Sequence, residues 1–325
     1  MSETNDGQVV GPRDVLRPGL TLEYPVPETM REQAERYLDD PASFEVATPR
    51  LASTVMLLRP RVAGSSVAAA GGTQTEAGGL GGASGPGGHE AREPFEVFML
   101  RRASTMAFVP DAVVFPGGSY DKRDDSYDVP FAGASLKAWA RRMSCDEATA
   151  RRAIVTAARE LFEECGVLLA TDAEDAPLHE SPCDVRWAQA RRQVSEREVS
   201  FGEFLSEHGL SLRADLLSVK AHWVTPLFEP RRYDTYFFCA RLPQGQAADG
   251  LTTEAAASGW STPRAMLDRA ETGRALLMPP TIANLSALAR AASLDEAIGE
   301  AEVCHVMLDP TRDAQGNVVM RSVIK

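Results

Sequence analysis

The chain has 325 residues, of which 44% are hydrophobic and 25% are charged, so it can form a sizeable globular core. Its formal net charge of -12 argues against broad binding to nucleic acids or anionic membranes, because both partners require clustered Lys and Arg. The five cysteines are scattered without a C-x-x-C pair, which favours reduced thiols over a disulfide framework or a zinc site.

The chain contains no apolar run of roughly 18 residues, the length that a membrane span requires. Its first residues, MSETNDGQVVGPRD, lack the basic start and apolar run of a signal peptide. We therefore expect a cytoplasmic location and no membrane partner.

Residues 1–48 are predicted to be a polar lead-in with one short helix in PETMREQAERYLDD. The β-branched run LASTVMLLRPRV predicts a strand at the start of the main domain. The Gly/Ala/Ser-rich segment 63–90 is predicted to be a disordered loop, because it has too few apolar residues to offset its ordering entropy. PFEVFMLRR predicts the next strand, so this loop should connect two neighbours of one sheet.

The middle of the chain is predicted to contain a third short strand, AVVFPGG, that ends in a Pro-Gly-Gly turn. Residues 119–143 are partly acidic and are predicted to be an irregular insertion. A long helix should follow, with a capping box of Ser144 and Glu147 at its start and Gly166 at its end.

The last third of the chain alternates predicted strands and helices. HWVTP and YDTYFFCARLP predict strands, and a helix should run from Thr262-Pro263 to about Gly273. PPTIANLSALARAAS predicts an apolar helix, SLDE caps another, and EVCHVML with NVVMRSVI predicts a hairpin. We therefore predict one mixed α/β domain over 49–290 and a C-terminal helix and hairpin extension over 291–325.

The long helix carries Glu160, Glu163 and Glu164 within five consecutive positions of AARELFEECGVLL. At 100° per residue these carboxylates fall within roughly a 100° arc, opposite an apolar stripe. Arg159 is spaced i,i+4 from Glu163 and can pair with it. A solvated acidic face explains the pattern on its own. The glycine turn at Gly118 favours a cation site instead, because it lets carbonyl groups approach an ion and Mg²⁺ prefers oxygen ligands.

Gly118 and the later R-E-L-F-E-E-C-G-V resemble the Nudix box, G-x5-E-x7-R-E-U-x-E-E-x-G-U, in which U is a bulky aliphatic residue. Two features depart from that pattern. Far more residues separate Gly118 from Arg159 than the pattern has, and Arg151 occupies the position of its first Glu. An interrupted box of this kind resembles the Nudix hydrolase subgroup that contains a peroxisomal coenzyme A diphosphatase and bacterial relatives, with similarity over roughly residues 50–290.

This resemblance implies an α/β (α+β) Nudix-type fold, in which a mixed β-sheet is sandwiched between helices and the box contains a long insertion. It implies that Glu160, Glu163 and Glu164 hold Mg²⁺ or Mn²⁺. The Gly118 carbonyl would be a further ligand, and Arg159 would orient the carboxylates. The implied reaction is hydrolysis of a diphosphate linkage, with a box glutamate or a later acid as general base. Spacing does not choose among the later acids Glu229, Asp234 and Glu254.

The subgroup resemblance favours coenzyme A or acyl-CoA as substrate, with 3′,5′-ADP and (acyl-)4′-phosphopantetheine as products. The alternatives are NADH, a nucleotide sugar, a modified nucleoside triphosphate, or a non-catalytic module that binds a nucleotide as a sensor. The expected partner is thus a small nucleotide or CoA-type molecule, and a homodimer is left open.

Four arginines are predicted to bind a substrate phosphate or carboxylate, the alternative being solvated strand ends. They are Arg101, Arg102, Arg231 and Arg232. The acidic patch of the insertion is predicted to be a loop face near the mouth of the substrate site. It comprises Asp121, Asp124, Asp125 and Asp128.

Overall fold

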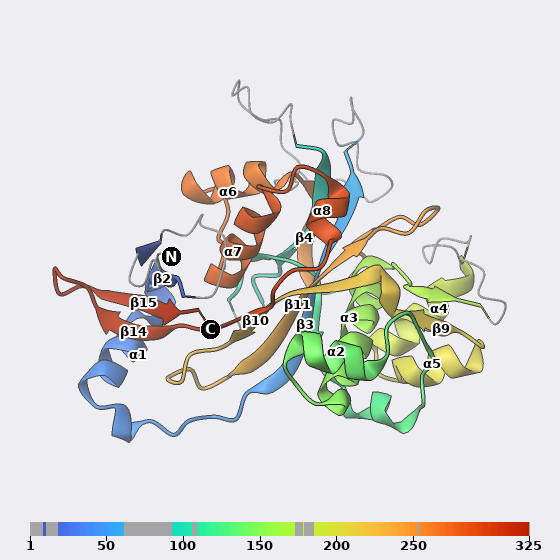
Figure 1. Cartoon of the computed structure of the whole chain (residues 1–325), viewed down its shortest axis with the longest axis horizontal. Helices are drawn as coiled ribbons and strands as arrows, with labels where there is room; N and C mark the ends of the chain where they lie inside the picture. Colours follow the sequence, from blue (N-terminus) through green and yellow to red (C-terminus); the bar gives the residue numbers. More distant parts are fainter. Residues whose placement is uncertain are drawn as a thin grey trace, which may run out of the picture.

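A central mixed sheet organises the computed structural model, which describes residues 9–10, 19–61, 93–105, 109–172, 178, 185–252 and 254–324 (Figure 1). Its strand order is β12 (Ala255–Ser261), β4 (Phe95–Arg102), β3 (Arg50–Pro60), β11 (Tyr233–Arg241), β10 (Leu217–Val224) and β13 (Cys304–Met307). Two short strands, β5 (Val113–Val114) and β6 (Gly117–Ser119), pair with β4 and β3. The β3/β11 and β10/β13 pairs are parallel, and the remaining pairs are antiparallel.

Helices cover both faces of this sheet, as β3 shows. Val55 and Leu57 belong to a core with α2 (Leu136–Met143), α3 (Glu147–Cys165), α4 (Val185–Ser195) and α5 (Phe201–Glu207). Met56 and Leu58 belong to a second core with α6 (Pro263–Glu271), α7 (Pro279–Leu288) and α8 (Leu294–Ile298). Successive strand residues point to opposite faces, so this apolar run of β3 contributes to both cores. The predicted sheet between helices is confirmed.

The predicted capping box of the long helix is wrong. Ser144 instead follows the last residue of α2, in the left-handed region at φ 54°. Asp146 is the N-cap of α3, and its carboxylate accepts a hydrogen bond from the Thr149 amide at 2.8 Å. At the other end Gly166 terminates α3 with φ 63°, as predicted, because glycine adopts this conformation without a Cβ penalty.

The segment around the predicted Pro-Gly-Gly turn also differs from expectation. Gly117 and Gly118 lie in β6, where they face Thr54 and Ser53 of β3, and not in a turn. The insertion over 119–143 is not irregular. It contains a 3₁₀ helix (Lys122–Ser126), the short strand β7 (Phe131–Ala132) and α2. β7 joins β9 (Ser211–Arg213) and β8 (Ala170–Thr171) in a small sheet.

The two ends of the chain meet in a separate four-stranded sheet, which we call the terminal sheet. Its order is β1 (Val9–Val10), β2 (Thr21–Pro25), β15 (Val318–Val323) and β14 (Asp309–Arg312), and α1 (Glu28–Asp39) lies beside it (Figure 1). The predicted C-terminal hairpin is wrong in its first strand. β13 pairs in parallel with β10, and β14 forms the hairpin with β15.

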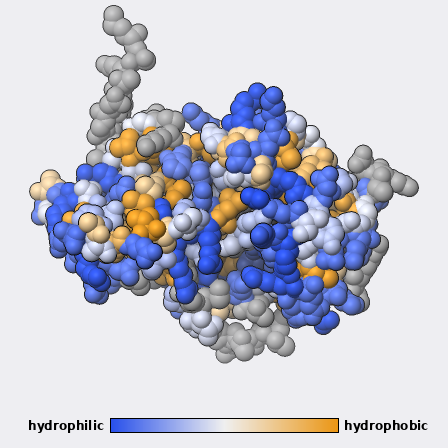
Figure 2. Space-filling view, turned by 90° about the horizontal axis from the view of Figure 1, so that it is seen from below, coloured by the Kyte–Doolittle hydropathy of each residue, from blue (hydrophilic) through white to orange (hydrophobic). Residues whose placement is uncertain are grey.

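The remaining predicted elements are confirmed within the described residues. These are the helices α1, α6, α7 and α8 and the strands β3, β4, β10 and β11. The predicted loop over 63–90 lies outside the described residues. In the part of the chain that the structure describes, no helix combines the length and apolar character needed to cross a bilayer. The face seen in Figure 2 is mostly hydrophilic, with separate hydrophobic patches.

A buried hydroxyl fixes α3 against the sheet. Ser53 of β3 is fully buried and donates a hydrogen bond to the Ala153 carbonyl at 2.7 Å. We expect Ser53→Ala to lower the free energy of unfolding by about 1 kcal/mol, the typical loss for one buried hydrogen bond. Exposed Ser43, which bonds the Asp40 carbonyl at 2.8 Å, provides the matched control. Denaturant titration should show almost no change for Ser43→Ala, and equal losses in the two variants would contradict this role of Ser53.

Candidate active site

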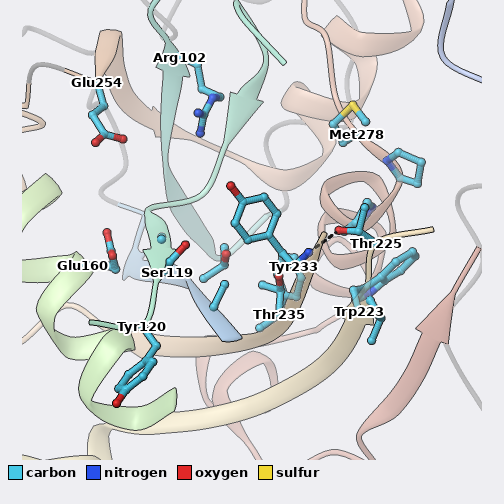
Figure 3. Close-up of a pocket in the computed structure, with 18 of the residues that line it drawn as sticks. Arg102, Ser119, Tyr120, Glu160, Trp223, Thr225, Tyr233, Thr235, Glu254 and Met278 are labelled. Carbon is cyan, nitrogen blue, oxygen red and sulfur yellow. Dashed lines mark hydrogen bonds between the residues drawn. The ribbon is translucent and has the colours of Figure 1, made fainter. Parts of the chain in front are cut away.

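A cavity of about 580 Å³ lies beside the glutamates of α3, and residues of β3, β6, β10, β11 and α7 line it. Figure 3 shows Glu160 and Glu254 on one side of this cavity, with Arg102 above and Trp223 and Met278 on the opposite side. The cavity therefore has a charged end and an apolar end.

Glu160 and Glu164 are buried, at 6% and 7% relative exposure. This burial rules out a solvated acidic face for these two residues. α3 packs against β6, where a Cβ built on Gly118 would lie 2.4 Å from Glu160 Oε1. The absence of a side chain at Gly118 thus leaves the space that the Glu160 carboxylate occupies. Beside it, Glu164 Oε2 accepts a hydrogen bond from the Gly117 amide at 2.9 Å.

Arg159 is the cation at the centre of this acidic cluster. Its Nη1 lies 2.8 Å from Glu163 Oε1, which confirms the predicted i,i+4 pair, and its Nη2 lies 2.9 Å from Glu160 Oε1. The same Nη2 donates to the Ser119 carbonyl at 2.6 Å, and Nε lies 3.4 Å from Asp124 Oδ2. The guanidinium is therefore hydrogen-bonded at both terminal nitrogens, while Nε makes only the longer ion-pair contact with Asp124. It positions the two glutamates that it contacts.

The cluster nevertheless has too little positive charge for its carboxylates. Burial raises the pKa of Glu160 to about 7, and Arg159 only partly opposes that shift. Burial also raises the pKa of Glu164 well above its ordinary value, and repulsion from Glu160 adds to the shift. The charge of Glu254 raises the pKa of both groups further. Each shift has the same meaning, namely that the ionised cluster would be stabilised by an additional cation.

The chemistry of these side chains fits a divalent cation. Mg²⁺ binds through a few carboxylates together with water and substrate phosphates. Among the described residues no three His, Cys, Asp or Glu side chains already converge as a ligand set. Glu163 is held by Arg159, and Glu164 by the Gly117 amide. Each of these contacts uses one oxygen of its carboxylate, as does the contact of Arg159 with Glu160. All three glutamates of α3 therefore keep a second oxygen for a cation, and Glu254 lies nearby on the cavity wall.

The four predicted substrate arginines occupy different environments. Arg102 lines the cavity, and its buried Nε has no hydrogen-bond partner among the described residues. Arg101, Arg231 and Arg232 are not part of the lining. Arg231 is exposed, whereas Arg232 is buried and donates to three backbone carbonyls, those of Ala47, Thr225 and Pro226. The structure therefore brings only Arg102 of this set to the cavity.

The three acids considered as general bases are also separated. Glu254 lines the cavity. Asp234 hydrogen-bonds to His222 on β10, and neither residue is part of the lining. Glu229 is buried outside the cavity, and burial raises its pKa. Only Glu254 thus lies where it can reach a substrate.

The acidic patch of the insertion is not a single loop face. Asp121 lines the cavity, as predicted for a residue near its mouth. Asp124 is buried below Arg159 and accepts a hydrogen bond from the Gly202 amide at 3.3 Å. Asp125 instead pairs with Arg152. The contact between Asp124 and Arg159 escaped sequence reasoning, because no spacing rule connects the 3₁₀ helix of the insertion to α3.

Lys122 and Arg197 are further cations on the cavity wall that sequence reasoning did not select. Their positive charge did not distinguish them in the sequence, because most Lys and Arg side chains lie on protein surfaces without a binding role.

A family model described as the NUDT19 Nudix domain matches residues 138–288, which include the glutamates of α3. Over these residues the chain carries a Nudix domain. Gly118 and Asp124 precede the matched range but contact the Nudix domain through Glu160 and Arg159.

Two curated relatives and one crystal structure resemble this chain. Putative nudix hydrolase 7 of Caenorhabditis elegans is 28% identical over 199 residues, 61% of this chain and 57% of the relative. Acyl-coenzyme A diphosphatase NUDT19 of Xenopus laevis is 26% identical over 238 residues, 62% of each chain. The NUDIX hydrolase of Alicyclobacillus acidocaldarius superposes with a TM-score of 0.58 at 26% identity, over 78% of this chain and 97% of that chain. The chain thus spans less than two thirds of the length of these two curated relatives.

Substitutions in the two glycines of β6 should have different effects on stability. A Cβ on Gly117 would lie 2.6 Å from the Ser53 carbonyl oxygen and 2.8 Å from Thr54 Cα, both of which are backbone atoms. We expect Gly117→Ala to cost about 1–3 kcal/mol, the usual range for overpacking. Gly118→Ala should cost less, because a Cβ there meets only the carboxylate end of Glu160, which can rotate away. Melting curves test this order, and a larger loss in Gly118→Ala would contradict the packing described here.

Proposed function

We propose that this protein is a metal-dependent hydrolase that cleaves the diphosphate linkage of a nucleoside diphosphate derivative. The observation that carries the proposal is the burial of two glutamates, Glu160 in the lining of the charged end of the cavity and Glu164 one turn further along α3. Among the described side chains, Arg159 is the only cation in direct contact with Glu160. A protein gains nothing in stability from two buried, mutually repelling carboxylates, and such arrangements are common at functional sites.

The residues of the cavity have separate roles in this proposal. Glu160, Glu163 and Glu164 hold Mg²⁺ or Mn²⁺, the Gly118 carbonyl is a further ligand, and Arg159 keeps Glu160 and Glu163 in place. A bound divalent cation neutralises the diphosphate oxygens and lowers the pKa of water. Glu254 lies on the same side of the cavity as Glu160 and is the general base that we assign. It accepts the proton of water as the new P–O bond forms and the bridging P–O bond breaks.

Three cations on the cavity wall are suited to bind the phosphates of the substrate. Arg102, Lys122 and Arg197 line the cavity, and Arg102 offers an Nε–H that no described residue uses. Guanidinium groups bind phosphates through paired hydrogen bonds, and a lysine ammonium contributes a point charge. The charged end thus holds both the acids for the cation and the basic groups for the anionic substrate.

Coenzyme A or an acyl-CoA is the substrate that we propose, with 3′,5′-ADP and (acyl-)4′-phosphopantetheine as products. Two findings support it. The family model carries the NUDT19 description, and NUDT19 of Xenopus laevis is named an acyl-coenzyme A diphosphatase. NADH, a nucleotide sugar or a modified nucleoside triphosphate is the alternative within the same chemistry. A non-catalytic nucleotide sensor is the alternative outside it.

Substitution of the buried glutamates should abolish most turnover. Glu160→Gln and Glu164→Gln remove one charge each with little change in shape, and each should lower kcat/KM by at least about 100-fold, equivalent to about 2.7 kcal/mol. Glu147→Gln is the matched control, since Glu147 is exposed in the first turn of the same helix. Its activity should stay near that of the wild type.

The measurement is mass spectrometry of products after incubation with Mg²⁺ and a panel of CoA, acyl-CoA, NADH and nucleotide sugars. Binding without turnover of any compound would support the sensor instead. Near-wild-type activity in Glu160→Gln or Glu164→Gln would contradict the metal assignment.

The raised pKa of Glu160 predicts a specific pH dependence for the metal-free protein. Because its pKa is about 7 when folded and about 4.3 when unfolded, the folded state binds more protons between these values. The stability that this group contributes is complete below pH ~4.3 and is lost as pH rises through ~7. The free energy of unfolding should therefore fall with rising pH in this window, and the slope should be smaller in Glu160→Gln. Denaturant titration between pH 5 and 8 tests this, and an identical slope in the variant would contradict it.

A further inference from the structure

The apolar end of the cavity lies away from the carboxylates and is formed by elements from both ends of the chain. Figure 3 shows Trp223 and Met278 on the side opposite Glu160 and Glu254, with Tyr233 between the two groups. The large apolar side chains in the lining of the whole cavity are Met30, Trp223, Phe237, Met278, Leu308 and Met320. All of them except Met278 belong to one core cluster or pack against it.

Half of this set lies outside the matched Nudix range of 138–288. Met30 belongs to α1, Leu308 lies between β13 and β14, and Met320 belongs to β15. Met320 faces Tyr24 of β2 in the register of the terminal sheet, so pairing of the two chain ends holds it in position. The terminal sheet and α1 thus provide one wall of the cavity whose other wall carries the glutamates.

The side chains of this wall suit a flexible hydrocarbon. Three of the six are methionines, whose unbranched thioether side chains adapt to partners of different length. Thr235 and Tyr233 line the cavity as well and supply polar groups between its two ends, and Thr225 adds a hydroxyl on the side of Trp223. A molecule bound across the cavity would meet cations and carboxylates first, then hydroxyls, then an apolar surface.

We propose that the apolar end is a subsite for an unbranched acyl chain carried by the substrate beyond its diphosphate, and that α1 and the terminal sheet set the preference for that chain. This inference rests on the proposed function, which it makes more specific. It assigns Met30, Met278 and Met320 as determinants of specificity, and it gives the two ends of the chain a role in the active site. Burial of methylene groups provides the preference, since each one transferred from water contributes roughly a fourfold gain in binding.

The experiment compares kcat/KM for hexanoyl-CoA with kcat/KM for CoA in the wild type, Met30→Gln and Met278→Gln. Both methionines are partly exposed to the cavity, so the substitutions replace apolar wall with polar wall and bury no new polar group in the core. The wild type should prefer hexanoyl-CoA. In each variant the ratio of kcat/KM for hexanoyl-CoA to kcat/KM for CoA should be about tenfold lower. Met307→Gln is the matched control, because Met307 is equally half-buried but lies outside this cavity, and its preference should equal that of the wild type.

The outcomes separate the two proposals. A wild type that hydrolyses neither compound contradicts the proposed substrate. A wild type that hydrolyses CoA and hexanoyl-CoA, with the same preference retained in both cavity variants, contradicts the subsite alone. Calorimetric binding of the two compounds to Glu164→Gln, with and without Met278→Gln, gives a second readout. It should show the same loss of preference in affinity, and an unchanged preference would overturn the inference.

Discussion

The structure depends on a local excess of negative charge inside the protein. Glu160 and Glu164 are both buried, burial raises the pKa of each carboxyl group, and the charge of Glu160 raises the pKa of Glu164 further. A single guanidinium, that of Arg159, contacts Glu160 and Glu163. Two carboxylates in a medium of low dielectric constant can lose one proton each only when a counter-charge is present. Arg159 provides part of that charge. A proton provides the rest at low pH, and in the proposed function a divalent cation provides it at neutral pH.

The fold maintains this arrangement through close packing of α3 against β6. The two glycines of β6 allow α3 to approach the sheet until Glu160 occupies the space beside Gly118. Ser53 holds the earlier turns of the same helix, and Asp124 of the insertion holds the edge of Arg159 that the glutamates leave free. The insertion is therefore part of the scaffold of the candidate site, even though it separates Gly118 from Arg159 in the sequence.

Sequence reasoning was reliable where the physics is local. The 3.6-residue period placed the glutamates on one face and paired Arg159 with Glu163, and Gly166 ended the helix as predicted. Sequence reasoning failed where two neighbouring residues could both cap the same helix, and where segments far apart in the sequence come into contact. Ser and Asp are both favourable N-cap residues. Asp146 is the N-cap of α3 here because Ser144 is still the C-cap of the preceding helix, α2. Asp124 and Glu254 reach the site through tertiary packing, which leaves no periodic pattern in the sequence.

The most direct test of the central claim is a crystal structure of the protein soaked in Mn²⁺, with anomalous diffraction used to locate the ion. The account predicts one anomalous peak between the carboxylates of Glu160 and Glu164, on the cavity side of Gly118. A well-ordered cluster without a peak, in which those carboxylates remain protonated or turn toward solvent, would contradict it.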